Sequence, residues 1–152
     1  MEGIRLIELP ACHMASSGPS SIEGGMNGFD AWFTAVDAAR ADRFFPRDFM
    51  WFDSRSQSMV WYYALPPGGD AGPWPVVEFP GGLFAVAVSI DGDDMDGERV
   101  YAGIKEWVDA QPHLELAEGP GWETMFHIVT SPAGAAVLGH HQLDIWVPVR
   151  AR

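Results

Sequence analysis

The apolar and polar positions at the start of the chain follow first a strand pattern and then a helix pattern. Residues 4–9 (IRLIEL) form a short apolar run that Pro10 stops, which predicts a strand. Residues 16–28 are rich in glycine and serine and favour a loop. From residue 29 to residue 40 the apolar side chains recur at helical spacing, which predicts an amphipathic helix of about three turns.

Two short apolar runs follow this helix and predict a β-hairpin. Residues 49–53 (FMWFD) and 59–65 (MVWYYAL) are joined by the polar residues SRSQ. The next run, residues 66–75 (PPGGDAGPWP), is dense in turn-forming residues. We expect this connector to divide the chain into two halves.

The second half shows a similar succession of patterns. Residues 76–90 predict two extended segments, interrupted at Pro80, and the second is apolar enough for a largely buried strand. Residues 91–111 predict a helix, because acidic residues lie near its start and a proline follows its end. Residues 122–129 and 141–149 predict the last two strands, separated by a turn with a proline and a glycine.

Both halves therefore have the order strand, helix, strand, strand, which indicates an internal duplication. This order places the fold in the α+β class, as an antiparallel sheet with two main helices on one face. A length of 152 residues suits one domain. We expect a single domain over residues 1–152, with internal repeats at about 1–67 and 74–152.

The charge of the chain narrows the classes of partner. There are 21 acidic against 9 basic residues, and the net charge of −12 disfavours direct binding of nucleic acid and attracts cations. Seven tryptophans and nine phenylalanines accompany this acidity, a combination that suits a site for aromatic or cationic small molecules. No apolar run approaches the roughly 18 residues of a membrane span and no secretion signal is visible, so we expect no membrane contact and a cytoplasmic location.

Motifs for metals, cofactors and nucleophilic catalysis are not evident. His140 and His141 are adjacent and would point to opposite faces of an extended chain, so they cannot readily share one ion. The acidic run at 91–98 lacks the spacing of a calcium loop and suits a helix start. Cys12 is the single cysteine and has no partner for a disulfide. We therefore predict no cofactor and no metal site.

Five segments along nearly the whole chain resemble the GyrI-like family, the effector-binding domain of AraC-type and MerR-type multidrug transcription regulators that also occurs as free-standing proteins. They are IRLIELPACHMASSG, EFPGGLFAVAVS, IKEWVDAQ, GWETMFH and LDIWVPVR. The resemblance implies a duplicated strand-helix-strand-strand unit and a pseudo-two-fold cleft that holds the ligand. Because the first predicted strand begins at residue 4, no DNA-binding segment is expected before it, and direct transcriptional activation is not expected.

The resemblance also implies one site residue, Glu123, which matches by context the acidic residue that members use for cationic ligands. Without this context, Glu123 would be taken for an ordinary exposed glutamate. The aromatic set is heavier than the family pattern requires and suggests a flat, polycyclic ligand. The candidate ligand-binding residues are Glu123, Trp51, Trp61, Tyr63, Trp122, Trp146 and Phe84.

Some of these aromatic residues have two interpretations. Trp61 and Tyr63 lie two positions apart on one face of a predicted strand, so they suit either a binding wall or ordinary core packing. Trp146, which alternates with Ile145 and Val147, is equally open. Trp32 and Trp107 are assigned to helix packing by their spacing.

Three functions are compatible with the sequence. The first is a binding protein for a hydrophobic aromatic ligand, in particular a cationic one. The second is a hydrolase that opens cyclopropane rings of DNA-alkylating natural products, as some free-standing relatives do, with Glu123 as the catalytic residue. The third is a protein-interaction module such as a gyrase inhibitor, since an acidic surface can mimic DNA. The oligomeric state is not predicted.

Overall fold

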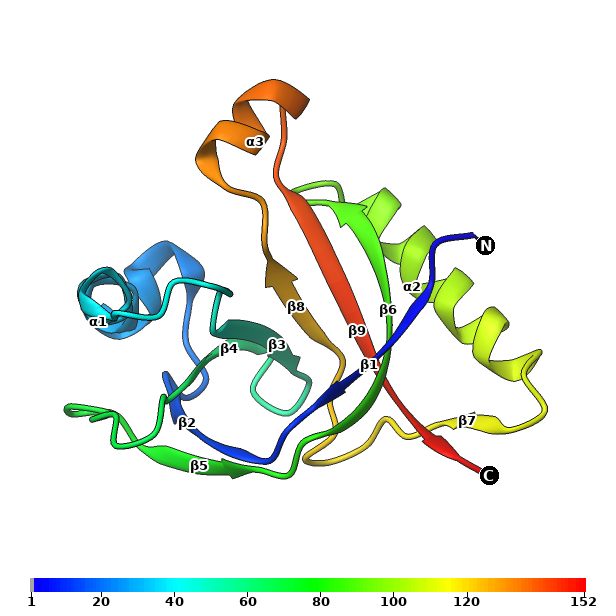
Figure 1. Ribbon diagram of the computed structural model, residues 1–152, viewed down its shortest axis with the longest axis horizontal. Helices are drawn as coiled ribbons and strands as arrows, with labels where there is room; N and C mark the ends of the chain where they lie inside the picture. Colours follow the sequence, from blue (N-terminus) through cyan, green and yellow to red (C-terminus); the bar gives the residue numbers. More distant parts are fainter. Residues whose placement is uncertain (1) are drawn as a thin grey trace. The chain divides into compact units, whose positions relative to one another are not determined.

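The computed structural model describes residues 2–152, which form two compact units (Figure 1). The C-terminal unit comprises residues 2–10 together with Gly81–Arg152, and the N-terminal unit comprises Ala11–Pro80. Among residues 2–152, no helix is long and apolar enough to cross a membrane.

The C-terminal unit is an antiparallel sheet with one long helix on one face. Its strands pair in the order β1, β6, β9, β8, and β7 pairs with the end of β9. Its elements are β1 (Arg5–Leu9), β6 (Gly82–Ile90), α2 (Asp94–Asp109), β7 (Leu114–Leu116), β8 (Met125–Ile128), α3 (Pro132–Leu138) and β9 (Gln142–Ala151).

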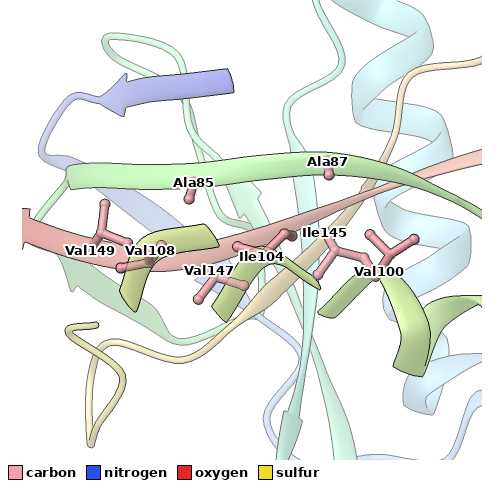
Figure 2. Close-up of a cluster of buried hydrophobic side chains, with 8 residues drawn as sticks. All are labelled: Ala85, Ala87, Val100, Ile104, Val108, Ile145, Val147 and Val149. Atoms are coloured by element: carbon pink, nitrogen blue, oxygen red, sulfur yellow. The ribbon is translucent and has the colours of Figure 1, made fainter. Parts of the chain in front are cut away.

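Helix α2 covers this sheet because its apolar residues recur on one face and meet small or β-branched residues of the strands (Figure 2). The cluster consists of Ala85, Ala87, Val100, Ile104, Val108, Ile145, Val147 and Val149. The alanines of β6 let the helix approach the sheet closely. Because this side of β6 and β9 is committed to α2, the alternate residues of both strands point to the opposite face.

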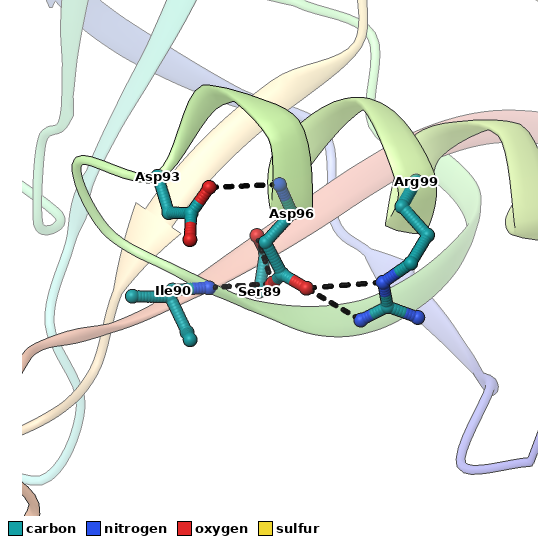
Figure 3. Close-up of polar contacts among 5 residues, drawn as sticks. All are labelled: Ser89, Ile90, Asp93, Asp96 and Arg99. Carbon is teal, nitrogen blue, oxygen red and sulfur yellow. Dashed lines mark hydrogen bonds and ion pairs between the residues drawn. The ribbon is translucent and has the colours of Figure 1, made fainter.

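The start of α2 is fixed by carboxylates (Figure 3). The side chain of Asp93 caps the helix by accepting a hydrogen bond from the backbone N–H of Asp96 at 3.0 Å. Asp96 in turn accepts hydrogen bonds from the Ser89 hydroxyl, the Ile90 backbone N–H and the Arg99 guanidinium. These bonds hold the pKa of Asp96 below its ordinary value, the bond from Arg99 having the largest effect. The acidic run at 91–98 therefore includes a helix cap, as the sequence indicates.

The strands of the N-terminal unit are also antiparallel and pair in the order β5, β2, β4, β3. Helix α1 packs on one face through an aromatic core that includes Phe29, Phe33 and Tyr63. Its elements are β2 (Cys12–Ser16), η1 (Ile22–Gly28), α1 (Phe29–Ala39), β3 (Asp48–Asp53), β4 (Ser58–Ala64) and β5 (Val76–Phe79).

The predicted α+β class and the duplicated order are confirmed, since β2-α1-β3-β4 and β6-α2-β8-β9 follow the same succession. The strand that leads the first repeat is β2 rather than residues 4–9, because β1 pairs with β6. Strand β1 precedes the first repeat in sequence but pairs with β6 of the C-terminal unit. Strand β5 precedes the second repeat but pairs with β2 of the N-terminal unit. The predicted turn around Pro132 is wrong, since α3 lies there with Ser131 as its N-cap.

Candidate functional site

The face of the C-terminal sheet opposite α2 carries two of the candidate residues, Phe84 and Trp146. Directly paired residues of antiparallel strands share a face, and the register pairs Arg5 with Val86, Val86 with Trp146 and Trp146 with Met125. The same register identifies the other residues on this face. We call this set the helix-free face: Arg5, Ile7, Leu9, Phe84, Val86, Val88, Met125, His127, Asp144, Trp146 and Pro148.

Three rings lie together in the middle of the helix-free face. The ring centroids of Phe84 and Trp146 are 5.9 Å apart, and those of His127 and Trp146 are also 5.9 Å apart. Both pairs meet edge to face, the arrangement that aromatic rings prefer. Each of the three side chains is 1% exposed. Phe84 and Trp146, both candidates from the sequence, are therefore brought together as a buried aromatic base.

A carboxylate is buried beside these rings. Asp144 is 3% exposed, and its Oδ2 lies 3.3 Å from Nη2 of Arg5 on β1. In the register, Asp144 is opposite Val88 on one side and His127 on the other. Charged side chains are rarely buried unless they are paired, so an acidic group at this depth marks a place where positive charge is favourable.

Trp122 and Glu123 lie in the turn that precedes β8. The six-membered ring of Trp122 rests on Gly82, the first residue of β6, so closely that an added Cβ would lie 2.4 Å from Cζ3. Glu123 is half-buried, and its Oε1 accepts a hydrogen bond from the Gly121 backbone N–H at 3.0 Å. The carboxylate of Glu123 is thus fixed within the turn, two residues before Met125 of the helix-free face.

This turn is tied to the rest of the C-terminal unit. The Ala117 backbone N–H donates to the Pro148 carbonyl at 2.9 Å. The hydroxyls of Tyr101 and Thr124 both donate to the carboxylate of Glu118. Burial, followed by this contact with Glu118, raises the pKa of Tyr101 to about 12. The turn that carries Trp122 and Glu123 is therefore anchored at several points.

In the N-terminal unit the candidate Trp51 lies on a different face of the strands from Trp61 and Tyr63. Trp51 pairs in register with Val60, and its ring centroid is 5.8 Å from that of Tyr62, on the face opposite α1. The indole N–H of Trp51 is buried and has no hydrogen-bond partner within residues 2–152. Trp51 therefore lies on the side of its strands that α1 does not cover.

Trp61 and Tyr63 lie on the other face, under α1. The ring of Trp61 is 5.1 Å from that of Phe33, and its indole N–H donates to Asp48 at 3.0 Å. Tyr63 is fully buried, 5.4 Å from Phe33, and burial raises its pKa. Of the two interpretations that the sequence leaves open for this pair, core packing describes their position.

Arg5, Asp144 and Tyr62 are the residues that sequence reasoning missed. Asp144 was available as a signal, because it stands two positions before Trp146 on one strand and must share its face. The position of Arg5 follows from the pairing of β1 with β6, which the linear pattern does not reveal.

No family model matches the sequence. No curated protein is detectably similar to it in sequence. Solved structures do match. SAV2435 bound to tetraphenylphosphonium superposes with a TM-score of 0.57 at 7% identity, over 97% of this chain and 94% of that chain.

The chain has the GyrI-like fold. A hydrolase from Listeria innocua superposes with a TM-score of 0.64 at 13% identity, over 97% of this chain and 91% of the other. The EcmrR C-terminal domain superposes with a TM-score of 0.56 at 12% identity, over 97% of each chain. These superpositions establish the shared fold. Because the identities are low, the function has to be argued from the site.

Proposed function

We propose that this protein binds hydrophobic aromatic ligands, with a preference for organic cations, on the helix-free face of the C-terminal unit. The observation that carries the proposal is the burial of Asp144 on the same strand face as Trp146, two positions away, with the ring of Phe84 against that of Trp146. Aromatic faces and a carboxylate both attract positive charge, and a hydrophobic cation satisfies both at once. Trp122 and Glu123, which are half-buried in the turn before β8, provide further contacts at the other end of this face from Asp144.

The energies are sufficient for a useful affinity. A cation over an aromatic ring gains about 0.5–2 kcal/mol, and a desolvated carboxylate adds a larger electrostatic contribution. Two rings and one carboxylate together are compatible with a dissociation constant in the micromolar range, which corresponds to a binding free energy on the order of −8 kcal/mol. The net charge of −12 also raises the local concentration of cations near the protein.

The shared fold supports this proposal. SAV2435 holds tetraphenylphosphonium, a bulky cation surrounded by phenyl rings, on the same fold. Trp51 is included as a further candidate contact, because its unpartnered indole N–H and its neighbour Tyr62 offer a ring and a donor on the helix-free surface of the N-terminal unit.

The test is a titration with tetraphenylphosphonium, followed by tryptophan fluorescence and calorimetry. We expect saturable binding to the wild type, weakened at least several-fold by Trp122→Ala and by Glu123→Gln. Glu98→Gln is the matched control, since it removes the same charge from an exposed position on α2. Failure of tetraphenylphosphonium and of a panel of other aromatic cations to bind would remove the proposal.

Hydrolysis is the second candidate, supported by the fold shared with the Listeria innocua hydrolase and by the fixed carboxylate of Glu123. In this function Glu123 directs a water molecule onto a strained cyclopropane ring, so that one carbon gains the hydroxyl and another the proton. Mass spectrometry of cyclopropane-bearing alkylators after incubation separates the candidates. A product heavier by one water, absent with Glu123→Gln, establishes the hydrolase, whereas intact compound supports binding alone.

A further inference from the structure

The buried carboxylate of the helix-free face is held by one long contact. Nη2 of Arg5 is 3.3 Å from Oδ2 of Asp144, whereas charge-assisted hydrogen bonds usually measure roughly 2.7–2.9 Å. The other oxygen, Oδ1, is buried and has no hydrogen-bond partner among the described residues 2–152. The bonding capacity of Asp144 is therefore only partly used. By comparison, Arg99 approaches Asp96 through two nitrogens, at 3.1 Å and 2.5 Å.

Arg5 is also placed where it can leave Asp144 at low cost. It lies on β1, the end strand of the C-terminal sheet, and its side chain is 52% exposed against 4% for Asp144. Val88, directly opposite Asp144 in the register, is 43% exposed. Solvent therefore reaches this end of the helix-free face, and the guanidinium can swing into water without uncovering the core beneath α2.

We propose that Arg5 is a built-in counter-ion, which a hydrophobic organic cation displaces from Asp144 when it binds. This inference rests on the proposed function and adds a second anionic contact, Asp144, and a residue that sets selectivity, Arg5. A buried carboxylate is stabilised by a positive neighbour, and two cations at one carboxylate repel each other, so an incoming cation gains most from Asp144 when it replaces the guanidinium. A neutral ligand leaves the ion pair intact and gains nothing from Asp144.

The exchange favours bulky cations in particular. The cost of removing an ion from water falls as its radius increases, so a large organic cation loses less hydration than the freed guanidinium regains. An anion of the same shape meets the opposite situation, since it is attracted by Arg5 and repelled by Asp144. The pair therefore works as a charge filter on the helix-free face.

Two probes of the same shape and opposite charge test this filter: tetraphenylphosphonium and tetraphenylborate. With Arg5→Gln, calorimetry at constant salt should show tetraphenylphosphonium binding on the order of tenfold more tightly than with the wild type. Tetraphenylborate should bind more weakly to this variant. Arg99→Gln is the matched control, because it removes the same charge from an ion pair on α2; less than about a twofold change is expected there.

Further variants show whether the effect passes through Asp144. Asp144→Asn should weaken tetraphenylphosphonium binding, and Arg5→Gln combined with Asp144→Asn should lose the gain seen with Arg5→Gln alone. Because Arg5→Gln leaves a buried charge without its partner, its folding is checked by circular dichroism. The wild type supplies a second measurement: the Arg5 Nε–H signal in a nitrogen-15 spectrum should shift to a free-guanidinium position as tetraphenylphosphonium is added.

The outcomes separate this inference from the proposed function. If the wild type binds tetraphenylphosphonium but neither Arg5→Gln nor the Arg5 signal responds, the displacement is wrong and the binding function stands. If neither the wild type nor Arg5→Gln binds it, both fail. Binding that appears only after Arg5→Gln would overturn the displacement, because the cation then fails to replace the guanidinium in the wild type.

Discussion

Gly82 allows the most direct structural test of the turn that carries Trp122. An alanine Cβ at this position would lie 2.4 Å from Cζ3 and 2.7 Å from Cη2 of the Trp122 ring. An ordinary carbon contact is about 3.5 Å, so Cζ3 must move by at least about 1.1 Å (3.5 − 2.4). Gly82→Ala is therefore expected to push the indole away from the start of β6.

The stability cost of Gly82→Ala has two parts. The φ angle of +133° is one that side-chain-bearing residues rarely adopt, which costs about 1–3 kcal/mol. Overpacking against the ring adds about 1–3 kcal/mol. Urea denaturation should therefore show a loss of free energy of unfolding of about 2–6 kcal/mol. Tetraphenylphosphonium affinity should fall as well, because Trp122 is a proposed contact.

Two comparisons isolate the contribution of the ring. Gly121 also has a positive φ, +82°, but an added Cβ there would have nothing within 4 Å, so Gly121→Ala should cost only about 1–2 kcal/mol. Trp122→Ala should relieve the clash, so Gly82→Ala should destabilise that background less than the wild type. Strictly additive effects of Gly82→Ala and Trp122→Ala would show that the Trp122 ring does not contribute to the cost of Gly82→Ala.

Three further predictions concern the C-terminal unit. Ile104→Ala removes a fully buried side chain beneath β6 and β9 and should cost about 2–5 kcal/mol in urea denaturation; a loss below about 1 kcal/mol would contradict the core assignment. Asp96 has a lowered pKa, so its contribution is present above its ordinary pKa and lost as pH falls through the lower folded value; Asp96→Asn should therefore reduce the loss of stability on acidification below about pH 4. Tyr101 has a pKa raised from 10.0 to about 12, so its contribution is complete below pH 10 and lost towards pH 12; Tyr101→Phe should flatten the stability profile between these values, and an unchanged profile would argue against the contact with Glu118.

Most elements of the fold follow from the sequence because their patterns are local. Helix α2 is bounded by its acidic start and by Pro112, and the hairpin of β3 and β4 by its polar turn. The exchange of leading strands was not accessible, because nothing in residues 4–9 indicates that they pair with β6 rather than with β2. Pairing between distant strands depends on tertiary contacts that a linear pattern does not encode.

The site was predicted less completely, for a related reason. Strand β4 is apolar at most positions, so alternation alone does not show which face α1 covers; Trp61 and Tyr63 lie beneath the helix, while Tyr62 faces away from it. Asp144 and Trp146 were linked by alternation, but the role of Arg5 required the register of β1. Glu123 was identified only through the family resemblance, and its participation in binding stays a prediction.

Ligand binding at the helix-free face can be followed directly through the seven indole N–H groups of the protein. A nitrogen-15 spectrum, with signals assigned by single Trp→Phe variants, would be recorded during titration with tetraphenylphosphonium. If the ligand binds the helix-free face, the signals of Trp122 and Trp146 move first and furthest. Those of Trp61 and Trp107, which pack on the sides of the strands that the helices cover, stay nearly unchanged. The largest shifts at Trp61 or Trp107 would place the ligand elsewhere and contradict binding at the helix-free face.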